Sequence, residues 1–491
     1  MMRRTARLLA ILGVSAALLV SGCATNPVSK RSEFVLMSED QELALGRQMH
    51  AEVLQEYGEY KDPKLQAYVQ QVGERVAALS DRPQLIYRFT VLDSPEVNAF
   101  ALPGGYIYIT RGIMAYFNSE AELAAVLGHE IGHVTARHAV RQYTAAQATG
   151  ILATIGSIFV PGLGSYGGSQ LINVLGTALL RGYGREHELE ADGLGARYMA
   201  KEGYDPMAML NVLSTLKNQE TLENQIAKQE GREPRVYHGV FSTHPDSDTR
   251  LQEVVGAARQ LQGGSAKRLD RDRYFSNIDG MIVGDSPREG FVRGNAFYHP
   301  DLGFGLRFPK GWSVKNYPDR IMFVAPGGKA LMQMGAEDLN KRMSPKQFMI
   351  ERMGLKKLSY EGAINPSGLE GYTAVAPART SKGTRDARFS VIFFNNKAYM
   401  LAGLVDSGGS VPVFDNAFLD TASSFHPLTA QERESLKPLR MRIAPATAGD
   451  TFGKLAAESP YPTNAEARLR LLNGYFRGGE VPAGDLMKLV E

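Results

Sequence analysis

Residues 119–137 read SEAELAAVLGHEIGHVTAR and decide what the rest of this 491-residue chain is built around. Ser119 followed by Glu122 three positions later is the pattern of a capping box, which predicts that a helix begins there. Apolar residues recur at helical spacing along the stretch, at Leu123, Leu127, Ile131 and Val134. This stripe predicts a helix that packs into the core of the protein.

The same stretch contains His-Glu-Ile-Gly-His over residues 129–133. Residues four apart on a helix lie one above the other, so His129 and His133 can offer two imidazole nitrogens to one metal ion. Glu130 lies about 100° round the helix from His129, where it can reach water at the metal and act as general base. This H-E-x-x-H spacing is typical of a zinc peptidase. We expect one Zn²⁺ per chain, because these ligand types favour zinc.

Nothing directly downstream of the pentad supplies a third metal ligand. A metzincin would carry a histidine ten residues after His129, but that position is Ala139. His138 lies about 140° round the helix from His133 and is expected to face elsewhere. The third ligand is therefore sought in a second helical pattern, which opens at Arg185 with REHELEAD.

The pattern R-x-x-E-x-x-A-D over residues 185–192, together with the H-E-x-x-H helix, resembles the zinc metallopeptidase family of HtpX, the CAAX prenyl protease and the bacterial β-barrel-assembly-enhancing protease. The resemblance implies that Glu188 is the third zinc ligand and that Asp192 orients a ligand histidine. Glu186 and Glu190 are rival ligands, each about 200° from Glu188 on the same helix. The implied fold is α+β, with a mainly helical, zincin-like peptidase domain and a small edge sheet.

The resemblance extends to residues 98–112, NAFALPGGYIYITRG. Their alternating aromatic and β-branched residues predict a strand. In a zincin such a strand edges the cleft and pairs with the substrate backbone. That role would fall to Asn98, Tyr106, Ile107 and Tyr108. A plain strand within a sheet is the alternative interpretation.

A further motif, THPDSDTR over residues 243–250, resembles the family's H-P motif with an arginine six residues after the histidine. Peptide hydrolysis builds negative charge on the carbonyl oxygen, and His244 and Arg250 could stabilise that oxyanion. His244 could instead fill the open position on the metal as a fourth ligand. A turn-capping His244 with a solvated Arg250 is the third interpretation.

The start of the chain resembles a bacterial lipoprotein signal over residues 1–22. Three arginines precede an apolar run from Leu8 to Val20, too short to span a bilayer comfortably, and VSGC follows. Cleavage before Cys23, the only cysteine, would leave it lipidated, and the Ala and Thr after it suggest the outer membrane. We expect a periplasmic protein held to that membrane by a tether over residues 23–37.

The composition, 44% hydrophobic and 22% charged, is that of a globular protein, and the length indicates more than one domain. A net charge of +3 is too small to indicate a nucleic-acid partner. Shifts in pattern predict a peptidase domain over 38–262, a linker over 263–290, a small α+β domain over 291–428 and a C-terminal module over 436–491.

The C-terminal module resembles LysM, a β-α-α-β fold that binds glycan chains of peptidoglycan. The resemblance rests on GDT at 449–451, LNG at 472–474 and PAG at 482–484. A non-binding module of the same shape is the alternative.

Residues 142–180 contain no Asp, Glu, Lys or Arg and are broken by a glycine-rich stretch, 161–168. Each arm is shorter than a membrane span, and the glycines would expose backbone to lipid. A buried helical hairpin and a mobile apolar flap over the cleft are the two interpretations.

Together these features predict a membrane-anchored periplasmic zinc endopeptidase that hydrolyses misfolded or stalled envelope proteins. Peptidoglycan and the outer-membrane assembly machinery are further candidate partners. One alternative is a periplasmic chaperone or assembly scaffold with a structural or latched zinc site, for which Glu130 would not be needed. Another is a wall-associated hydrolase, but the paired carboxylates of a glycosidase cannot be placed.

Overall fold

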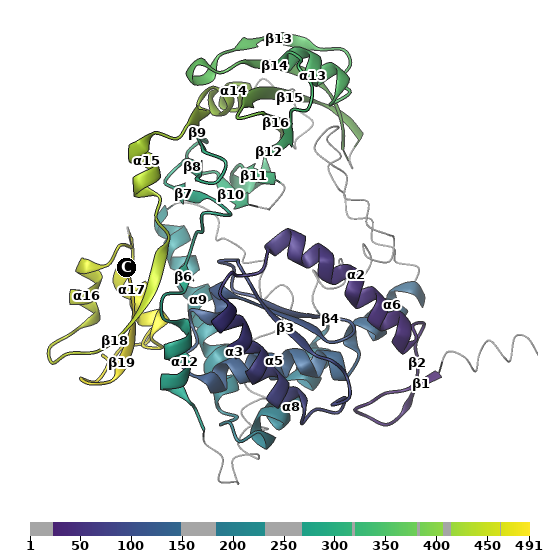
Figure 1. The fold of residues 1–491 in the computed structure, drawn as a ribbon, viewed down its shortest axis with the longest axis vertical. Coiled ribbons are helices and arrows are strands. Elements are labelled where there is room, and N and C mark those ends of the chain that lie inside the picture. The colour runs from purple at the N-terminus through teal and green to yellow at the C-terminus, as the bar shows by residue number, and fades with distance from the viewer. Residues whose placement is uncertain are drawn as a thin grey trace, which may run out of the picture.

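The computed structural model describes residues 23–148, 183–230, 268–316, 320–380, 383–405, 414–461 and 463–491. Helices and several sheets make up these residues, which confirms the predicted α+β class. A mainly helical part comes first, a β-rich part follows, and the C-terminal elements lie back against the helical part (Figure 1). No helix within the described ranges is long and apolar enough to span a membrane.

The first part contains the helices that carry and surround the metal-binding pattern. Their bounds are Glu39–Tyr57 (α2), Pro63–Ala77 (α3), Arg111–Met114 (α4), Glu120–Thr135 (α5), His138–Ala148 (α6), Arg185–Lys201 (α8) and Ala208–Glu230 (α9). A capping box between Ser38 and Gln41 begins α2, and the Asp62 side chain caps α3. Of the apolar segment 142–180, the first seven residues belong to α6, and the remainder lies outside the described residues.

Helix α5 is the central element of this part, as the sequence predicts. Every one of its residues is buried, and it packs against α3, α8 and α9. The Ser119 hydroxyl caps it by accepting a hydrogen bond from the Glu122 amide. The Glu122 carboxylate accepts from the amide of Asn118, at 2.8 Å, rather than from that of Ser119 as a capping box requires. The helix therefore begins where predicted, with a cap that reaches one residue further back.

A three-stranded sheet lies beside α5 in the order β3-β5-β4, with the bounds Arg88–Leu92 (β3), Tyr106–Thr110 (β5) and Ala99–Leu102 (β4). β3 and β5 are parallel, and β4 is antiparallel to β5. The segment predicted as one strand is a hairpin, because Gly104 and Gly105 take φ values of +80° and +89° and turn the chain. Strand β4 lies at the edge of this sheet and packs against α5.

Residues 23–37 fold onto the first part. Cys23–Thr25 (β1) and Ser32–Phe34 (β2) pair as an antiparallel hairpin. Val35 and Met37, which follow directly, are buried among residues of α2, β5 and α6. The prediction of a tether over these residues is therefore wrong, because their apolar side chains have a core to enter.

The β-rich part contains two antiparallel sheets. The larger has the order β10-β11-β12-β16-β15-β14-β13, and the smaller has the order β17-β9-β8-β7. The strands are Phe291–Arg293 (β7), Ala296–His299 (β8), Phe304–Arg307 (β9), Ser313–Asn316 (β10), Arg320–Val324 (β11), Ala330–Asp338 (β12), Ser359–Ile364 (β13), Gly371–Thr380 (β14), Gly383–Phe394 (β15), Lys397–Val405 (β16) and His426–Pro427 (β17). The helices are Pro345–Glu351 (α13), Asp415–Ser423 (α14) and Ala430–Ser435 (α15), with 3-10 turns at Pro326–Gly328 and Pro366–Gly368. Figure 1 places the larger sheet at the far end from α5 and α8.

The C-terminal module follows the order strand, helix, helix, strand. Its elements are Leu439–Pro445 (β18), Phe452–Glu458 (α16), Ala465–Leu472 (α17) and Leu486–Val490 (β19), and β18 pairs antiparallel with β19. A short strand from before the β-rich part, Ile282–Val283 (β6), pairs with β18 as well.

The predicted linker over 263–290 is wrong for residues 271–283. Arg271–Ile278 forms helix α12, in which Tyr274, Phe275 and Ile278 are fully buried. These side chains belong to one hydrophobic core that includes residues of α3, α5 and the C-terminal module. The first part and the C-terminal module are therefore packed as one body.

A buried lysine links the C-terminal module to the first part of the chain. Lys488 of β19 is fully buried, and its Nζ donates to the carbonyl oxygens of Ala115 and Phe117, each at 2.8 Å, just before α5. Burial lowers the pKa of Lys488 and raises that of nearby Glu122 on α5. The end of the chain thus contacts the start of the metal-bearing helix.

Candidate metal centre

Helices α5 and α8 approach closely because glycines line their contact. A methyl group at Gly195 of α8 would lie 2.7 Å from the backbone nitrogen of His129. One at Gly132 of α5 would lie 2.9 Å from the carbonyl oxygen of Ala191. Both distances are too short for a side chain, so this spacing requires glycine. The close contact brings side chains of α8 within reach of those of α5.

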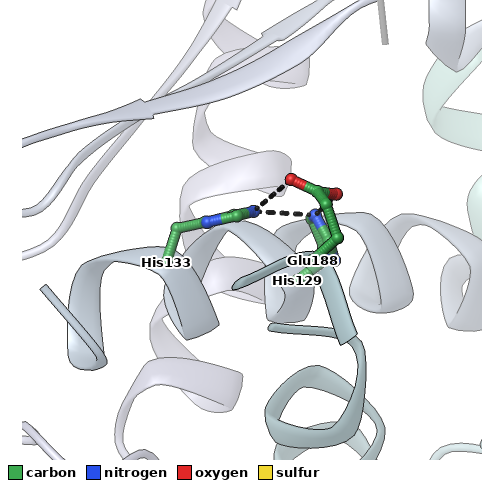
Figure 2. Close-up of side chains that lie close together, drawn as sticks. All are labelled: His129, His133 and Glu188. Atoms are coloured by element: carbon green, nitrogen blue, oxygen red, sulfur yellow. Dashed lines mark hydrogen bonds and ion pairs between the residues drawn. The ribbon is translucent and has the colours of Figure 1, made fainter. Parts of the chain in front are cut away.

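Three side chains from these two helices converge (Figure 2). His129 Nε2 and His133 Nε2 are 3.0 Å apart. His129 Nε2 lies 3.6 Å from Oε2 of Glu188, and His133 Nε2 lies 3.6 Å from Oε1 of the same carboxylate. All three are buried, and their potential ligand atoms lie within 4.8 Å of one another. Within the described ranges, these three form the group of His, Cys, Asp and Glu side chains that could hold a metal ion.

The donor set fits zinc. A tetrahedral zinc site takes imidazole nitrogen and carboxylate oxygen at about 2.0–2.2 Å, which puts neighbouring ligand atoms roughly 3.3–3.5 Å apart. The separations of 3.0 and 3.6 Å lie on either side of that range. Three protein ligands would leave a fourth position open, as in catalytic zinc sites. Of the rival ligands, Glu186 is exposed and Glu190 bonds to His138 and Arg141.

Asp192 lies where the sequence predicts a carboxylate that orients a ligand histidine. It follows Glu188 by one turn of α8, and its Oδ1 lies 2.8 Å from Nδ1 of His129. A carboxylate at that distance holds the hydrogen on Nδ1 and leaves Nε2 free for a metal.

His133 has a partner that the sequence did not reveal. Its Nδ1 lies 2.8 Å from Nδ1 of His138, which is fully buried. The prediction that His138 faces elsewhere is wrong, because α5 ends at Thr135 and the chain turns at Arg137, whose φ is +56°. His138 therefore begins a new helix, and the angular spacing of one continuous helix does not apply to it. His138 in turn lies 3.1 Å from the Glu190 carboxylate and holds the pKa of Glu190 down, at about 2, together with Arg141.

Glu130 and Tyr183 lie beside the three convergent side chains. Glu130 follows His129 on α5 and is 1% exposed. The ring of Tyr183 stacks on that of His133, with the centroids 4.2 Å apart. Burial, with the negative charges of Glu130 and Glu188, raises the pKa of Tyr183 well above its usual range. Its hydroxyl therefore stays protonated at neutral pH. Sequence reasoning missed Tyr183, which no motif marks.

Strand β4 borders the candidate metal centre. A cavity of about 10 Å³ is lined by His133, Tyr183 and the end of β4 at Ala101 and Leu102, among others. The Thr110 amide donates to the Asn98 carbonyl at 3.0 Å, so these two residues form a bonded pair of the ladder. Because bonded pairs alternate in an antiparallel ladder, Ala99 and Ala101 direct their backbone groups away from β5.

The predicted substrate-pairing role of Tyr106, Ile107 and Tyr108 is wrong. These residues belong to β5, the central strand, which pairs with β3 on one side and β4 on the other. Their backbone groups are used within the sheet, and the Tyr108 hydroxyl lies 2.6 Å from Nδ1 of His50. Asn98, the fourth residue of that prediction, pairs with Thr110 at the start of the edge strand.

Three predicted residues have no described side chain. His244 and Arg250 lie outside the described residues, so their roles as transition-state donors, or of His244 as a fourth ligand, stay predictions. Cys23 is the first residue of β1, and its lipidation stays a prediction too.

Two histidines and a carboxylate on packed helices, with a buried glutamate beside them, define a metallopeptidase centre. The sequence profile of peptidase family M48 matches residues 63–258. The mitochondrial metalloendopeptidase OMA1 of Schizosaccharomyces pombe is 31% identical over 251 residues, which cover 50% of this chain and 69% of that protein. The chain belongs to peptidase family M48, a family of zinc-dependent metallopeptidases, as its motifs predict.

Bacterial relatives are similar over a smaller share of their length. The protein named β-barrel assembly-enhancing protease in Yersinia pestis is 31% identical over 237 residues, 46% of this chain and 46% of that protein. Its namesake in Escherichia coli strain K12 is 29% identical over 212 residues, 41% of this chain and 40% of that protein. The matched segments thus span less than half of these two relatives.

Proposed function

We propose that this chain is a zinc-dependent endopeptidase of the periplasm, anchored to the outer membrane through Cys23, that hydrolyses misfolded or stalled envelope proteins. The observation that carries the proposal is the convergence of His129, His133 and Glu188 beside a buried Glu130. A purely structural zinc site would have no need of Glu130. The lipoprotein-like start and the names of the bacterial relatives support the envelope address.

Each residue of the site has a separate task in this proposal. His129, His133 and Glu188 hold one zinc ion, and Asp192 keeps the ring of His129 in place. When bound, zinc supplies a Lewis acid that lowers the pKa of water and polarises the scissile carbonyl. Glu130 takes a proton from the attacking water and delivers it to the leaving amine. His244 and Arg250 are the predicted donors to the oxyanion.

The edge strand supports unfolded chains as the substrate class. Ala99 and Ala101 direct backbone N–H and C=O groups away from β5, and Ala101 lines the same cavity as His133. A substrate that pairs there must be extended and must have its own backbone groups free. Folded proteins offer few such segments, whereas misfolded or stalled proteins expose many. Selection would then depend on the state of the substrate more than on its sequence.

The test is degradation of casein by the purified lipid-free chain and by Glu130→Gln, with bound zinc measured in both. Glutamine has nearly the same shape but cannot act as a base, so the variant should keep zinc and lose activity by about 10²- to 10⁴-fold. Glu186→Gln, on an exposed position of α8, is the matched control and should cleave like the wild type.

Two results would contradict the proposal in different ways. An active Glu130→Gln variant would mean that another group is the base. If wild type and variant both hold zinc and neither cleaves, the site is structural or latched, and the chaperone or scaffold interpretation gains.

Anchoring to the membrane through Cys23 is tested separately. A Cys23→Ser variant expressed in a Gram-negative host should move from the membrane fraction to the soluble periplasm and fail to incorporate labelled fatty acid. A variant that stays with the membrane would contradict lipid anchoring.

Binding of the C-terminal module to peptidoglycan remains a prediction. Co-sedimentation of the full chain with purified sacculi tests it. Failure to co-sediment would favour a non-binding module of the same shape.

A further inference from the structure

We propose that His138 is a positioning residue for the metal ligand His133, acting through a relay that continues to Glu190 and Arg141. The inference rests on the ligand role proposed above for His133. The relay comprises four side chains. The hydrolytic mechanism does not use His138, Glu190 or Arg141 directly, and it uses His133 only through Nε2.

The contacts of the relay run in one line. His133 Nδ1 lies 2.8 Å from His138 Nδ1, and His138 Nε2 lies 3.1 Å from Glu190 Oε2. Arg141 Nη1 donates to the same Glu190 oxygen at 2.9 Å. The His138 side chain is fully buried, whereas those of Glu190 and Arg141 are each 29% exposed. The relay thus leads from a buried ligand to the protein surface.

When His133 offers Nε2 to a metal, one arrangement of hydrogens satisfies the three contacts of the relay. The hydrogen of His133 is then on Nδ1, and it must donate to His138 Nδ1. His138 consequently carries its hydrogen on Nε2, which donates to Glu190. A carboxylate can only accept, and Glu190 accepts from both His138 and Arg141. The charge of Glu190 therefore sets the tautomer of His138, and His138 sets that of His133.

The relay also fixes the ring of His133 in space. The stacked ring of Tyr183, at 4.2 Å and 21° between planes, restricts the tilt of the His133 ring. A hydrogen bond to Nδ1 restricts rotation within that plane. Because His133 comes from α5, His138 and Arg141 from α6 and Glu190 from α8, the relay holds three helices at the positions that the site needs.

The two ligand histidines therefore differ in their support. His129 bonds directly to the carboxylate of Asp192, whereas His133 reaches the carboxylate of Glu190 through a second imidazole. Outer partners of this kind change metal affinity by about 10- to 100-fold when removed. We therefore expect loss of the His138 imidazole to weaken zinc binding by about that factor.

The experiment compares four variants of the full chain by zinc affinity, measured in competition with a chelator. His138→Phe keeps a ring but removes both nitrogens, and it should bind zinc about 10- to 100-fold more weakly than the wild type. His138→Asn keeps an acceptor near the position of Nδ1 and should recover most of the affinity. Glu190→Ala, at a half-buried position, frees the His138 tautomer and should fall between the two.

His187→Phe is the matched control, because its ring stacks on that of His138, with centroids 4.3 Å apart, without joining the relay. It should bind zinc like the wild type. The visible spectrum of the cobalt-substituted chain gives a second readout, since a displaced His133 alters the ligand field, and thermal unfolding of the metal-free variants reports any general loss of structure.

The outcomes separate this inference from the proposed function. A wild type that binds no zinc refutes the ligand role and the relay with it. A wild type that binds zinc, with His138→Phe and Glu190→Ala equal to it in affinity and cobalt spectrum, overturns the relay alone. Weak binding by His138→Phe and His138→Asn alike, with Glu190→Ala and His187→Phe unchanged, would also overturn it, since only packing at His138 would then matter.

Discussion

Replacement of Gly195 by alanine tests whether the close contact of α5 and α8 positions the metal ligands. The new methyl group would lie 2.7 Å from the His129 nitrogen and 2.9 Å from the carbonyl carbon of Gly128. Ordinary van der Waals contact begins near 3.4 Å, so the helices must separate by about 0.7 Å. Backbone atoms line the contact, and no flexible side chain can move aside to absorb that shift.

Such a shift exceeds what a zinc site tolerates. Ligand distances in metal sites hold to about ±0.2 Å, and Glu188 is on the helix that must move. Overpacking of this kind costs about 1–3 kcal/mol in stability. We therefore expect Gly195→Ala to remain folded, with a lowered midpoint of thermal unfolding, weaker zinc binding by at least about tenfold and a matching loss of casein cleavage.

Gly193→Ala is the control on the same helix. Nothing lies within 4 Å of the position that its methyl group would occupy, and Gly193 is exposed. This change should stabilise the protein by about 0.5–1 kcal/mol, since alanine loses less entropy in a helix. The measurements are chelator competition, calorimetry and casein cleavage. If Gly195→Ala and Gly193→Ala bind zinc equally well, the glycine contact does not position the ligands.

Three further predictions follow from other parts of the structure. Lys488→Met should destabilise the chain by roughly 2–5 kcal/mol, because the carbonyls of Ala115 and Phe117 lose their donor. Denaturant unfolding measures this loss and should show the first part and the C-terminal module unfolding in one transition. Ala101→Pro removes an N–H that points away from β5 and should raise KM for casein roughly five- to tenfold. Because Ala101 is buried, thermal unfolding of the variant is measured alongside, and an unchanged KM in a folded variant would contradict substrate pairing with β4. Burial raises the pKa of Glu289 to about 8 from 4.5, so the folded state keeps a proton that the unfolded chain releases, and the free energy of unfolding should fall as pH rises from about 4.5 to 8. Glu289→Gln should show a smaller fall than the wild type, because Glu122, whose pKa burial also raises, still contributes to it. Urea midpoints at pH 5 and 8 would measure the difference.

The sequence was most informative where the signals are local. Helix α5 begins at the expected residue because the Ser119 cap and the apolar spacing act over a single turn or two. Helix α8 also begins where expected, at Arg185, although its N-cap residue, Gly184, has no side chain to cap it. His129, His133, Glu188 and Asp192 come together as the motif spacing and the family resemblance implied. These placements depend on residues within two short stretches.

Predictions failed where the outcome depends on distant partners. Which strand of the β4–β5 hairpin is central depends on β3, from earlier in the chain, and no pattern within 98–112 states it. The direction of the His138 side chain was predicted wrongly because Arg137 takes a left-handed backbone conformation, which an arginine in the sequence does not indicate. The supposed linker did carry a signal, since Tyr274, Phe275 and Ile278 are spaced for one face of a helix.

The hairpin of β1 and β2 limits where the chain could work. Fifteen extended residues would reach roughly 50 Å, but residues 23–37 double back, and Val35 already lies in the core. A lipid on Cys23 would therefore keep helices α5 and α8 close to the bilayer and leave them little freedom to move away from it. Under the function proposed above, encounter with a substrate would then scale with how much unfolded protein lies at the membrane surface, and protein diffusing deeper in the periplasm would largely escape cleavage.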